Sequence, residues 1–220
     1  MHFAITLRIY CNALWNDVFL KDTYRTIAST PVETLFKEKG SKFFGYAFPV
    51  LKEEEVKHHL TNLRKQHPTA GHFCYAWQLG TEPFHYRASD DGEPSNSAGM
   101  PIYGQLLAFE VTNALVVSVR YFGGTKLGVG GLIQAYKHSA KITLEETTIV
   151  ERTIDVHFQL NFGYDLMNKV MRMVKEKNIK IINQELGINC TYIIAVRKKD
   201  SVIVFNRFEC LHKLKIIKLP

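Results

Sequence analysis

The sequence predicts an α+β protein made of two domains, and three observations support this. Segments with strand-like and helix-like patterns follow one another along most of its 220 residues, a length that suits one or two domains. The charge is uneven, because residues 152–220 hold 13 Lys and Arg against 6 Asp and Glu, whereas residues 1–151 hold 15 of each. The last third also has its own order of elements, so we expect a boundary near residue 150.

The first expected domain contains four strands and three helices. The strands are expected at 41–50, 72–79, 84–89 and 114–122, and the helices at 53–68, 101–109 and 132–147. The second strand alternates and is rich in aromatic residues, as strands are. In the first helix Val56, Leu60 and Leu63 share one face, and acidic residues precede basic ones in line with the helix dipole. Pro101 suits the first turn of the second helix.

The second expected domain follows a strand, helix, strand, strand, helix, strand order. Its strands are expected at 153–160, 179–186, 188–197 and 213–219, with helices at 164–178 and from Ser201 onward. Gly187 is the expected turn between the two central strands, and Ser201 is the expected cap of the last helix. This succession is the split βαβ plan of ferredoxin-like domains.

Composition and the N-terminal segment exclude several classes of protein. With 46% hydrophobic and 22% charged residues, the chain is expected to be soluble. Residues 1–21 are apolar but are interrupted by Arg8, Asn12 and Asp17, so we predict no export signal there. We also find no apolar run long enough for a membrane span. The four cysteines are far apart in the sequence, which favours reduced thiols in the cytoplasm over a zinc site or a disulfide framework.

A glycine-rich stretch follows the expected strand at 114–122 and precedes a helix. We call residues 122–131 the glycine loop; its glycines are Gly123, Gly124, Gly128, Gly130 and Gly131. A strand, loop and helix in this order can present an anion-binding helix N-terminus. The spacing excludes a Walker loop, because Val129 and Gly130 occupy the positions of its Lys and Ser or Thr. Two interpretations remain open, namely anion binding and a purely structural need for positive φ and close packing.

A second polar stretch, SDDGEPSNSAG at 89–99, is called the acidic loop. Its side chains of interest are Asp90, Asp91, Glu93 and Ser95. Their spacing does not match a calcium loop, so we predict neither a metal nor a cofactor. The carboxylates are expected either to accept N–H groups of their own loop or to pair with Arg120 and Lys126. We predict that the acidic loop and the glycine loop face each other and form the functional surface of the first domain.

An enzymatic role is the alternative for the acidic loop. Ser95 or Ser97 would serve as nucleophile with His72 and Asp91 as its partners. No G-x-S-x-G elbow supports this, and a His on a mostly apolar strand is more often structural. We therefore keep a small hydrolase acting at residues 90–95 as the alternative function only.

The excess positive charge points to a polyanion. Lys169, Arg172 and Lys175 are spaced by three residues on the expected helix at 164–178, so they should share its solvent face. A second cluster is Arg197, Lys198 and Lys199 at a strand end. Both clusters are candidate contacts to RNA phosphates, and a merely solvated basic surface is the other interpretation.

Four segments together resemble one family. SKFFGYAFPV, HFCYAW, SDDGEPSNSAGMPI and RYFGGTKLGVGGL occur in the order and spacing of the YigZ/IMPACT family, in its bacterial two-domain form. The resemblance implies that residues 22–150 are similar to ribosomal protein S5 domain 2 and to domain IV of elongation factor G. It implies that residues 151–220 form a ferredoxin-like domain similar to elongation factor G domains III and V. Residues 1–21 match nothing in the family, and two interpretations remain open, namely an upstream extension and a mis-set start of the sequence.

The resemblance also implies a function in translation. Eukaryotic relatives act in translational control by binding an activator of a starvation-sensing kinase, through a region that includes an extra N-terminal domain. This chain does not match that domain, so that partner does not carry over. We expect a cytoplasmic, translation-linked regulator that binds RNA, the ribosome or a translation-associated protein, and that is not an enzyme.

Overall fold

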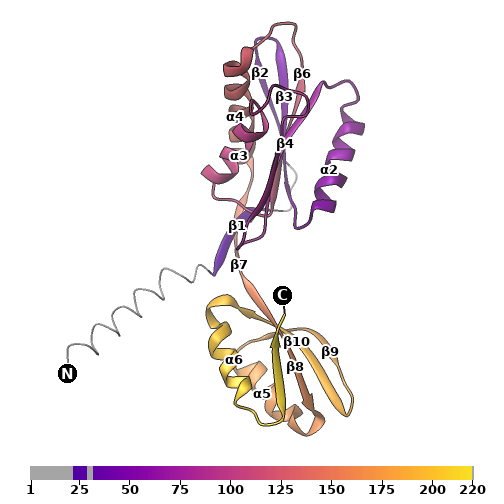
Figure 1. Ribbon diagram of the computed structural model, residues 1–220, viewed down its shortest axis with the longest axis vertical. Helices are drawn as coiled ribbons and strands as arrows, with labels where there is room; N and C mark the ends of the chain where they lie inside the picture. Colours follow the sequence, from indigo (N-terminus) through magenta and orange to yellow (C-terminus); the bar gives the residue numbers. More distant parts are fainter. Residues whose placement is uncertain (1–21, 29–31, 220) are drawn as a thin grey trace, which may run out of the picture. The chain divides into compact units, whose positions relative to one another are not determined.

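The structure is a computed structural model that describes residues 22–28 and 32–219, so the expected extension at residues 1–21 lies outside the described residues. Two compact units are present (Figure 1). The N-terminal unit is Tyr24–Arg152, and the C-terminal unit contains residues 153–219 together with Asp22 and Thr23. Among the described residues, no helix is both long and apolar enough to cross a membrane.

The N-terminal unit is centred on a five-stranded sheet in which all neighbouring strands are antiparallel. Its order is β2 (Val32–Glu38), β3 (Ser41–Pro49), β6 (Ala114–Tyr121), β4 (His72–Leu79) and β5 (His85–Ser89). The central strand β6 is buried along nearly its whole length, because helices cover both faces of the sheet. The strands expected from 41, 72, 84 and 114 are all present, and β4 has the expected bounds.

The helices of this unit create two separate cores (Figure 1). α3 (Gly99–Ala108) and α4 (Gly128–Glu146) cover one face of the sheet, and α2 (Glu53–Gln66) covers the other. Successive side chains of a strand point to opposite faces, so Val116 joins the core under α3 and α4 while Leu115 and Val117 join the core under α2. β5 ends where the acidic loop begins, and β6 ends where the glycine loop begins.

The C-terminal unit is a four-stranded antiparallel sheet with two helices on one face (Figure 1). Its elements are β8 (Asp155–Gly163), η1 (Tyr164–Leu166), α5 (Met167–Glu176), β9 (Lys180–Glu185), β10 (Asn189–Arg197), η2 (Lys198–Asp200), α6 (Ser201–Glu209) and β11 (Leu214–Lys218). The strand order is β11-β8-β10-β9, so each helix connects two strands that have another strand between them. The expected strand, helix, strand, strand, helix, strand order is confirmed.

Several local expectations need correction. Ser201 is the first residue of α6 and does not cap it, because its hydroxyl donates to the Lys198 carbonyl at 2.6 Å within the preceding 3-10 turn. α4 begins at Gly128 and not at the expected residue 132, so Gly128, Gly130 and Gly131 belong to its first residues. The sequence patterns also missed β2, as well as β1 (Thr23–Ile27) and β7 (Ile149–Thr153), which pair with each other in a separate sheet.

Candidate functional site

Arg120 and Glu93 join the two candidate loops of the N-terminal unit. Arg120 lies near the end of β6, immediately before the glycine loop, and its Nη1 donates to Glu93 Oε1 at 2.6 Å. The Tyr136 hydroxyl, from α4, donates to the same oxygen at 2.7 Å. Only 6% of the Arg120 side chain and 5% of the Glu93 side chain are exposed. Arg120 was expected to meet a carboxylate of the acidic loop, but the sequence did not single out Glu93. The pair holds the acidic loop against the start of the glycine loop.

The surroundings of the Arg120 guanidinium leave one donor without an acceptor. Its Nη2 donates to Ser41 Oγ at 3.3 Å, and its charge lies 5.5 Å from the Phe43 ring centroid and 5.6 Å from that of Phe122. Arg120 Nε is the buried side-chain nitrogen that has no hydrogen-bond partner within the described part of the chain. Buried donors are almost always satisfied, so this atom calls for an explanation.

Asp90 organises the acidic loop from inside. Its carboxylate accepts the N–H groups of Asn96, Ala98 and Gly99 at 2.8 to 2.9 Å. α3 starts at Gly99, and its N-cap residue, Ala98, has no hydrogen-bonding group in its side chain. Asp90 therefore satisfies N–H groups at the start of α3, as a side-chain cap would. Of the two expectations for this residue, acceptance of N–H groups from its own loop is the one the geometry shows.

Asp91 pairs with a cation that the sequence patterns did not indicate. Its carboxylate accepts Arg64 Nη2 from α2 at 2.8 Å and the Phe73 N–H at 2.6 Å. The expected pairing with Arg120 or Lys126 is therefore wrong for Asp91, because α2 presents Arg64 at that edge of β4. The sequence did show that α2 ends in basic residues, including Arg64. The helix dipole explains their position in the helix, but it does not identify the carboxylate with which Arg64 pairs.

His72 contacts two groups of the acidic loop. His72 Nδ1 is 2.9 Å from the Asp91 backbone carbonyl, and its Nε2 is 3.9 Å from Glu93 Oε1. Ser97 is buried and donates to the Pro94 carbonyl at 2.6 Å, while Ser95 is exposed. Burial raises the pKa of the nearby Cys74 thiol well above its ordinary value, which keeps it a poor nucleophile. Within residues 22–28 and 32–219, no hydrogen bond joins His72 to a serine.

Backbone conformation or close packing explains four of the five glycines in the glycine loop. A Cβ on Gly123 would lie 1.9 Å from the Gly40 carbonyl carbon, so two backbones meet there. Gly124 and Gly128 have φ of +85° and +70°, which confirms the predicted positive φ. A Cβ on Gly131 would lie 3.2 Å from the Leu127 Cβ, a tight contact. Gly130 differs from these four, because its φ is not positive and a Cβ placed on it would meet no atom within 4 Å.

A pocket of about 280 Å³ lies between the two loops. It is lined by Glu93, Pro94, Arg120, Phe122, Lys126, Leu127, Gly128, Val129 and Leu132. Phe122 and Val129 are 57% and 54% exposed on this surface. Leu127, which occupies the N-cap position of α4, makes no side-chain hydrogen bond to the helix. The pocket thus combines two cations, one carboxylate and an uncapped helix N-terminus.

The predicted cations of α5 share its solvent face. Lys169, Arg172 and Lys175 are exposed, and Val170 and Val174 are buried on the opposite side. Arg172 Nε also donates to Glu176 at 2.8 Å, and this hydrogen bond lowers the pKa of that carboxyl. The charge of Arg172 is therefore already partly balanced.

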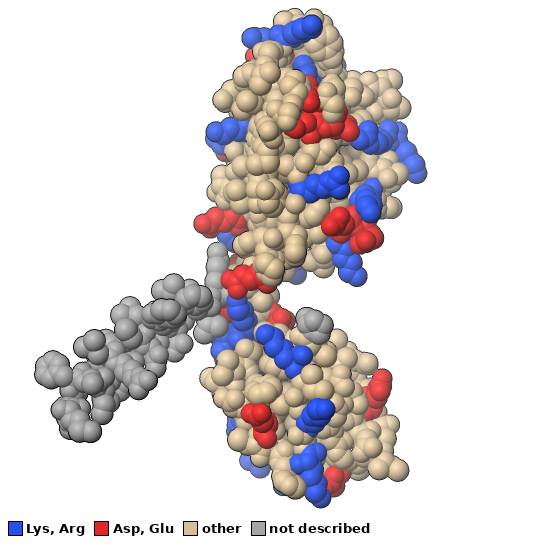
Figure 2. All heavy atoms as spheres, in the orientation of Figure 1, with Lys and Arg blue, Asp and Glu red and all other residues tan. Residues whose placement is uncertain are grey.

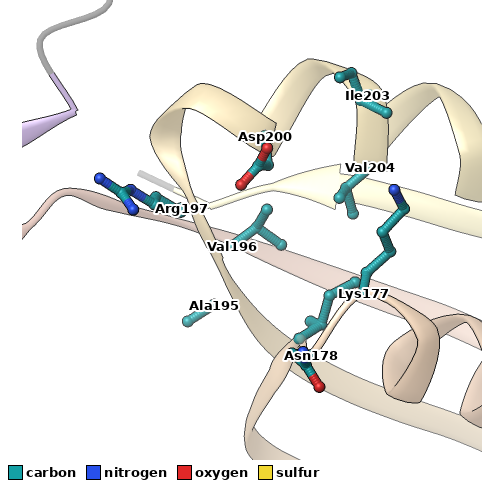
Figure 3. A pocket seen from close by; sticks show the side chains of 9 residues that line it. Lys177, Asn178, Ala195, Val196, Arg197, Asp200, Ile203 and Val204 are labelled. Carbon is teal, nitrogen blue, oxygen red and sulfur yellow. The ribbon is translucent and has the colours of Figure 1, made fainter.

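The second predicted cluster is arranged around the end of β10. Arg197 Nε donates to Asp22 in an ion pair, and the Lys199 side chain is exposed. Figure 3 shows Arg197 and Lys177 at opposite sides of a pocket of about 280 Å³, with Asp200 between them in this view. On the face shown in Figure 2, basic and acidic residues are interspersed in both units.

The fold and this site define a class of protein, namely a two-unit α+β protein. Its N-terminal unit holds the glycine loop against the buried Arg120–Glu93 pair. Residues 39–144 match the family model described as the Impact N-terminal domain. The chain is 30% identical to the IMPACT family member YvyE of Bacillus subtilis (strain 168), over 81% of this chain and 82% of that one. It is 32% identical to the IMPACT family member YigZ of Escherichia coli (strain K12), over 72% and 79%. The chain belongs to the IMPACT family.

Solved structures are also similar. A structure described as the crystal structure of an hypothetical protein covers 91% of this chain, with 99% of its own chain aligned, at a TM-score of 0.70 and 26% identity. A structure of the two-domain translational regulator Yih1 aligns with 57% of this chain and 46% of its own, at 25% identity. Its TM-score of 0.34 is too low to establish a common overall fold.

Proposed function

We propose that this protein is a translation-linked regulator that binds RNA through the cations of its C-terminal unit. One observation carries the proposal: Lys169, Arg172 and Lys175 are exposed together on α5, in the part of the chain that holds all of the net positive charge. Membership of the IMPACT family supports the link to translation, because the resemblance implies translational control. Translation takes place in the cytoplasm, so the proposal also places the protein there.

The proposal includes the finer fold assignments. We assign the C-terminal unit to the ferredoxin-like fold, and the strand order β11-β8-β10-β9 with two split crossovers supports this. We assign the N-terminal unit to the fold of ribosomal protein S5 domain 2, on the basis of the family resemblance. RNA is chosen over a protein partner because the excess charge of the C-terminal unit is positive, and a polyanion is the complementary partner.

The expected binding is electrostatic and insensitive to base sequence. Lysine ammonium groups contact phosphates as point charges and fix a protein's position without reading bases. Arg172 and Arg197 have carboxylate partners that they must exchange for phosphates, so they contribute less than Lys169 and Lys175. At about 0.7 per phosphate contact, we expect a slope of log affinity against log salt between about −2 and −4.

The test is a titration of the full chain with single-stranded ribosomal RNA across a salt series. The variant K169Q/K175Q should bind more weakly and should flatten the slope by about 1.4. The matched control, K57Q/K65Q on α2, removes the same charge from exposed lysines of the N-terminal unit and should leave the slope unchanged. Absence of binding at about 50 mM salt would overturn the RNA proposal and favour a translation-associated protein as partner.

The hydrolase alternative comes second to RNA binding in this proposal. The serines of the acidic loop have no general base among their described partners, since Ser97 donates to a backbone carbonyl and His72 faces the Asp91 carbonyl and Glu93. A serine nucleophile requires such a base within hydrogen-bond reach.

A further inference from the structure

We infer that the pocket between the glycine loop and the acidic loop binds the phosphate of a nucleotide, with the base lying against Phe122. This site belongs to the N-terminal unit and is independent of RNA binding by α5. Four features of the described residues support it. Three of them are groups that line the pocket, and the fourth, Gly130, follows the lining residue Val129 in the first turn of α4.

The first feature is the N-terminus of α4. The N–H groups of a helix's first turn have no acceptor within the helix, and the helix dipole makes this end attractive to anions. The α4 helix has 19 residues, and Leu127 provides no side-chain cap. Gly128 and Val129 line the pocket, so the first turn borders the space in which a phosphate would be held.

The second feature is the unsatisfied donor on Arg120, which lines the same pocket. Glu93 Oε1 already accepts from Arg120 Nη1 and from Tyr136, so Arg120 Nε needs an acceptor from another group. A phosphate oxygen held in the pocket would supply such an acceptor. Lys126, exposed on the pocket rim, adds a second positive charge and offsets the carboxylate of Glu93.

The third feature is Gly130. Its backbone conformation is open to any residue, and a Cβ there would meet nothing within 4 Å, so the fold does not require glycine at this position. In a helix, glycine is less favourable than alanine, which makes its presence a cost to stability. A ligand that approaches the backbone of the first turn explains it, because a side chain would then stand in its way.

The fourth feature is the exposed aromatic ring beside the cations. Phe122 lines the pocket and is 57% exposed, and the Arg120 guanidinium lies 5.6 Å from its ring centroid. Aromatic rings of this kind are stacking platforms for nucleic acid bases. The phosphate-binding and base-stacking groups are thus neighbours on one rim, which favours a nucleotide over a simple inorganic anion.

The experiment follows backbone N–H resonances of the full chain by NMR during titration with inorganic phosphate, adenosine 5′-monophosphate and a short single-stranded RNA. With phosphate and the mononucleotide we expect saturable shifts confined to residues 120–132 and their neighbours. The RNA should shift these residues and also those of α5, its separately proposed site, so affinities are compared at residues 120–132. The nucleotide should bind at least about fivefold more tightly than phosphate because of stacking. Tighter binding of the RNA than of the mononucleotide would assign the site to a nucleic acid strand, and equal binding would assign it to a free nucleotide.

Two variants and a matched control separate binding from folding. Gly130→Ala should keep or raise the melting temperature and weaken nucleotide binding at least about tenfold. Gly104→Ala in α3 is the control, since that glycine is also helical with open space around its Cβ position, and it should leave binding unchanged. Phe122→Ala should remove the advantage of nucleotide over phosphate. Absence of saturable shifts, or unchanged binding by Gly130→Ala, would overturn the inference, and equal affinity for phosphate and nucleotide would overturn its nucleotide part.

Discussion

Arg120 and Glu93 are 27 residues apart in the sequence and form a buried ion pair with a nitrogen to oxygen distance of 2.6 Å. The pair connects the end of the central strand to the acidic loop, which Asp91 also links to Arg64 and Phe73. Both groups are removed from water, so the desolvation cost is recovered only while both partners are present. This relationship makes the two loops one structural unit.

We expect Arg120→Met to be strongly destabilising, because it leaves the Glu93 carboxylate buried without its cation. Urea unfolding should show a loss of about 3 to 5 kcal/mol, and the double variant R120M/E93M should recover part of it. The exposed Lys126→Gln serves as control and should change the free energy of unfolding by less than about 0.5 kcal/mol. A loss below about 1 kcal/mol for Arg120→Met would show that the pair does not organise the loops.

Two glycines two residues apart should respond in opposite ways to the same substitution. Gly128 has a φ of +70°, so Gly128→Ala forces an L-residue into the left-handed region at a cost of about 1 to 2 kcal/mol. Gly130→Ala should be neutral or stabilising by up to about 1 kcal/mol, since neither φ nor a contact opposes it. Thermal unfolding of the two variants measures the contrast. Equal losses at both positions would contradict it.

Removal of the Asp90 side chain should loosen the start of α3. Asp90→Ala leaves three N–H groups without their acceptor and should cost about 1 to 2 kcal/mol or more in urea unfolding. Asp90→Asn keeps one acceptor oxygen and should lose less. Hydrogen exchange of the Ala98 and Gly99 amides should be faster in Asp90→Ala than in the native protein. Unchanged exchange there would show that Asp90 does not hold the helix end.

His67 should make stability fall in mild acid. Burial lowers the pKa of His67 below its ordinary value of 6.5, and its ring nitrogens lie 2.6 Å from the Tyr46 hydroxyl and 2.9 Å from that of Tyr121. The unfolded chain therefore binds the proton more readily than the folded protein. The stabilisation is fully present above pH 6.5 and is lost as the pH falls from there through the lowered folded value.

The pH effect is measured as melting temperature between about pH 5 and pH 8. His67→Gln should be less stable at neutral pH and should show a smaller decrease toward pH 5. His85→Gln, at an exposed position of β5, is the control and should keep the native pH profile. An equal decrease in His67→Gln and the native protein would assign the pH dependence to other groups, of which His59 is the first candidate because burial also lowers its pKa.

Periodicity along the chain was enough to predict most elements. The strand at 72–79 and the helix beginning at residue 53 were predicted because alternation and helical spacing are local properties of the sequence. The same reasoning missed β7, whose sequence IVERT has only a short alternation, and its partner β1 lies more than a hundred residues earlier. Strand pairing over that separation is decided by the assembled structure and leaves no local pattern.

The sequence by itself determined which residues carry charge, which positions bear glycine, and that the acidic and glycine loops flank the same strand and helix. It predicted that Arg120 would meet an acidic residue, but the tertiary structure chose Glu93 for it and gave Asp91 to Arg64. Charges alone do not select among neighbouring carboxylates, because the attraction between opposite charges has no direction and the packing of α2, β4 and β6 sets the distances. Likewise, five glycines look alike in a sequence, and only the backbone angles and the space around each one separate the structural glycines from Gly130.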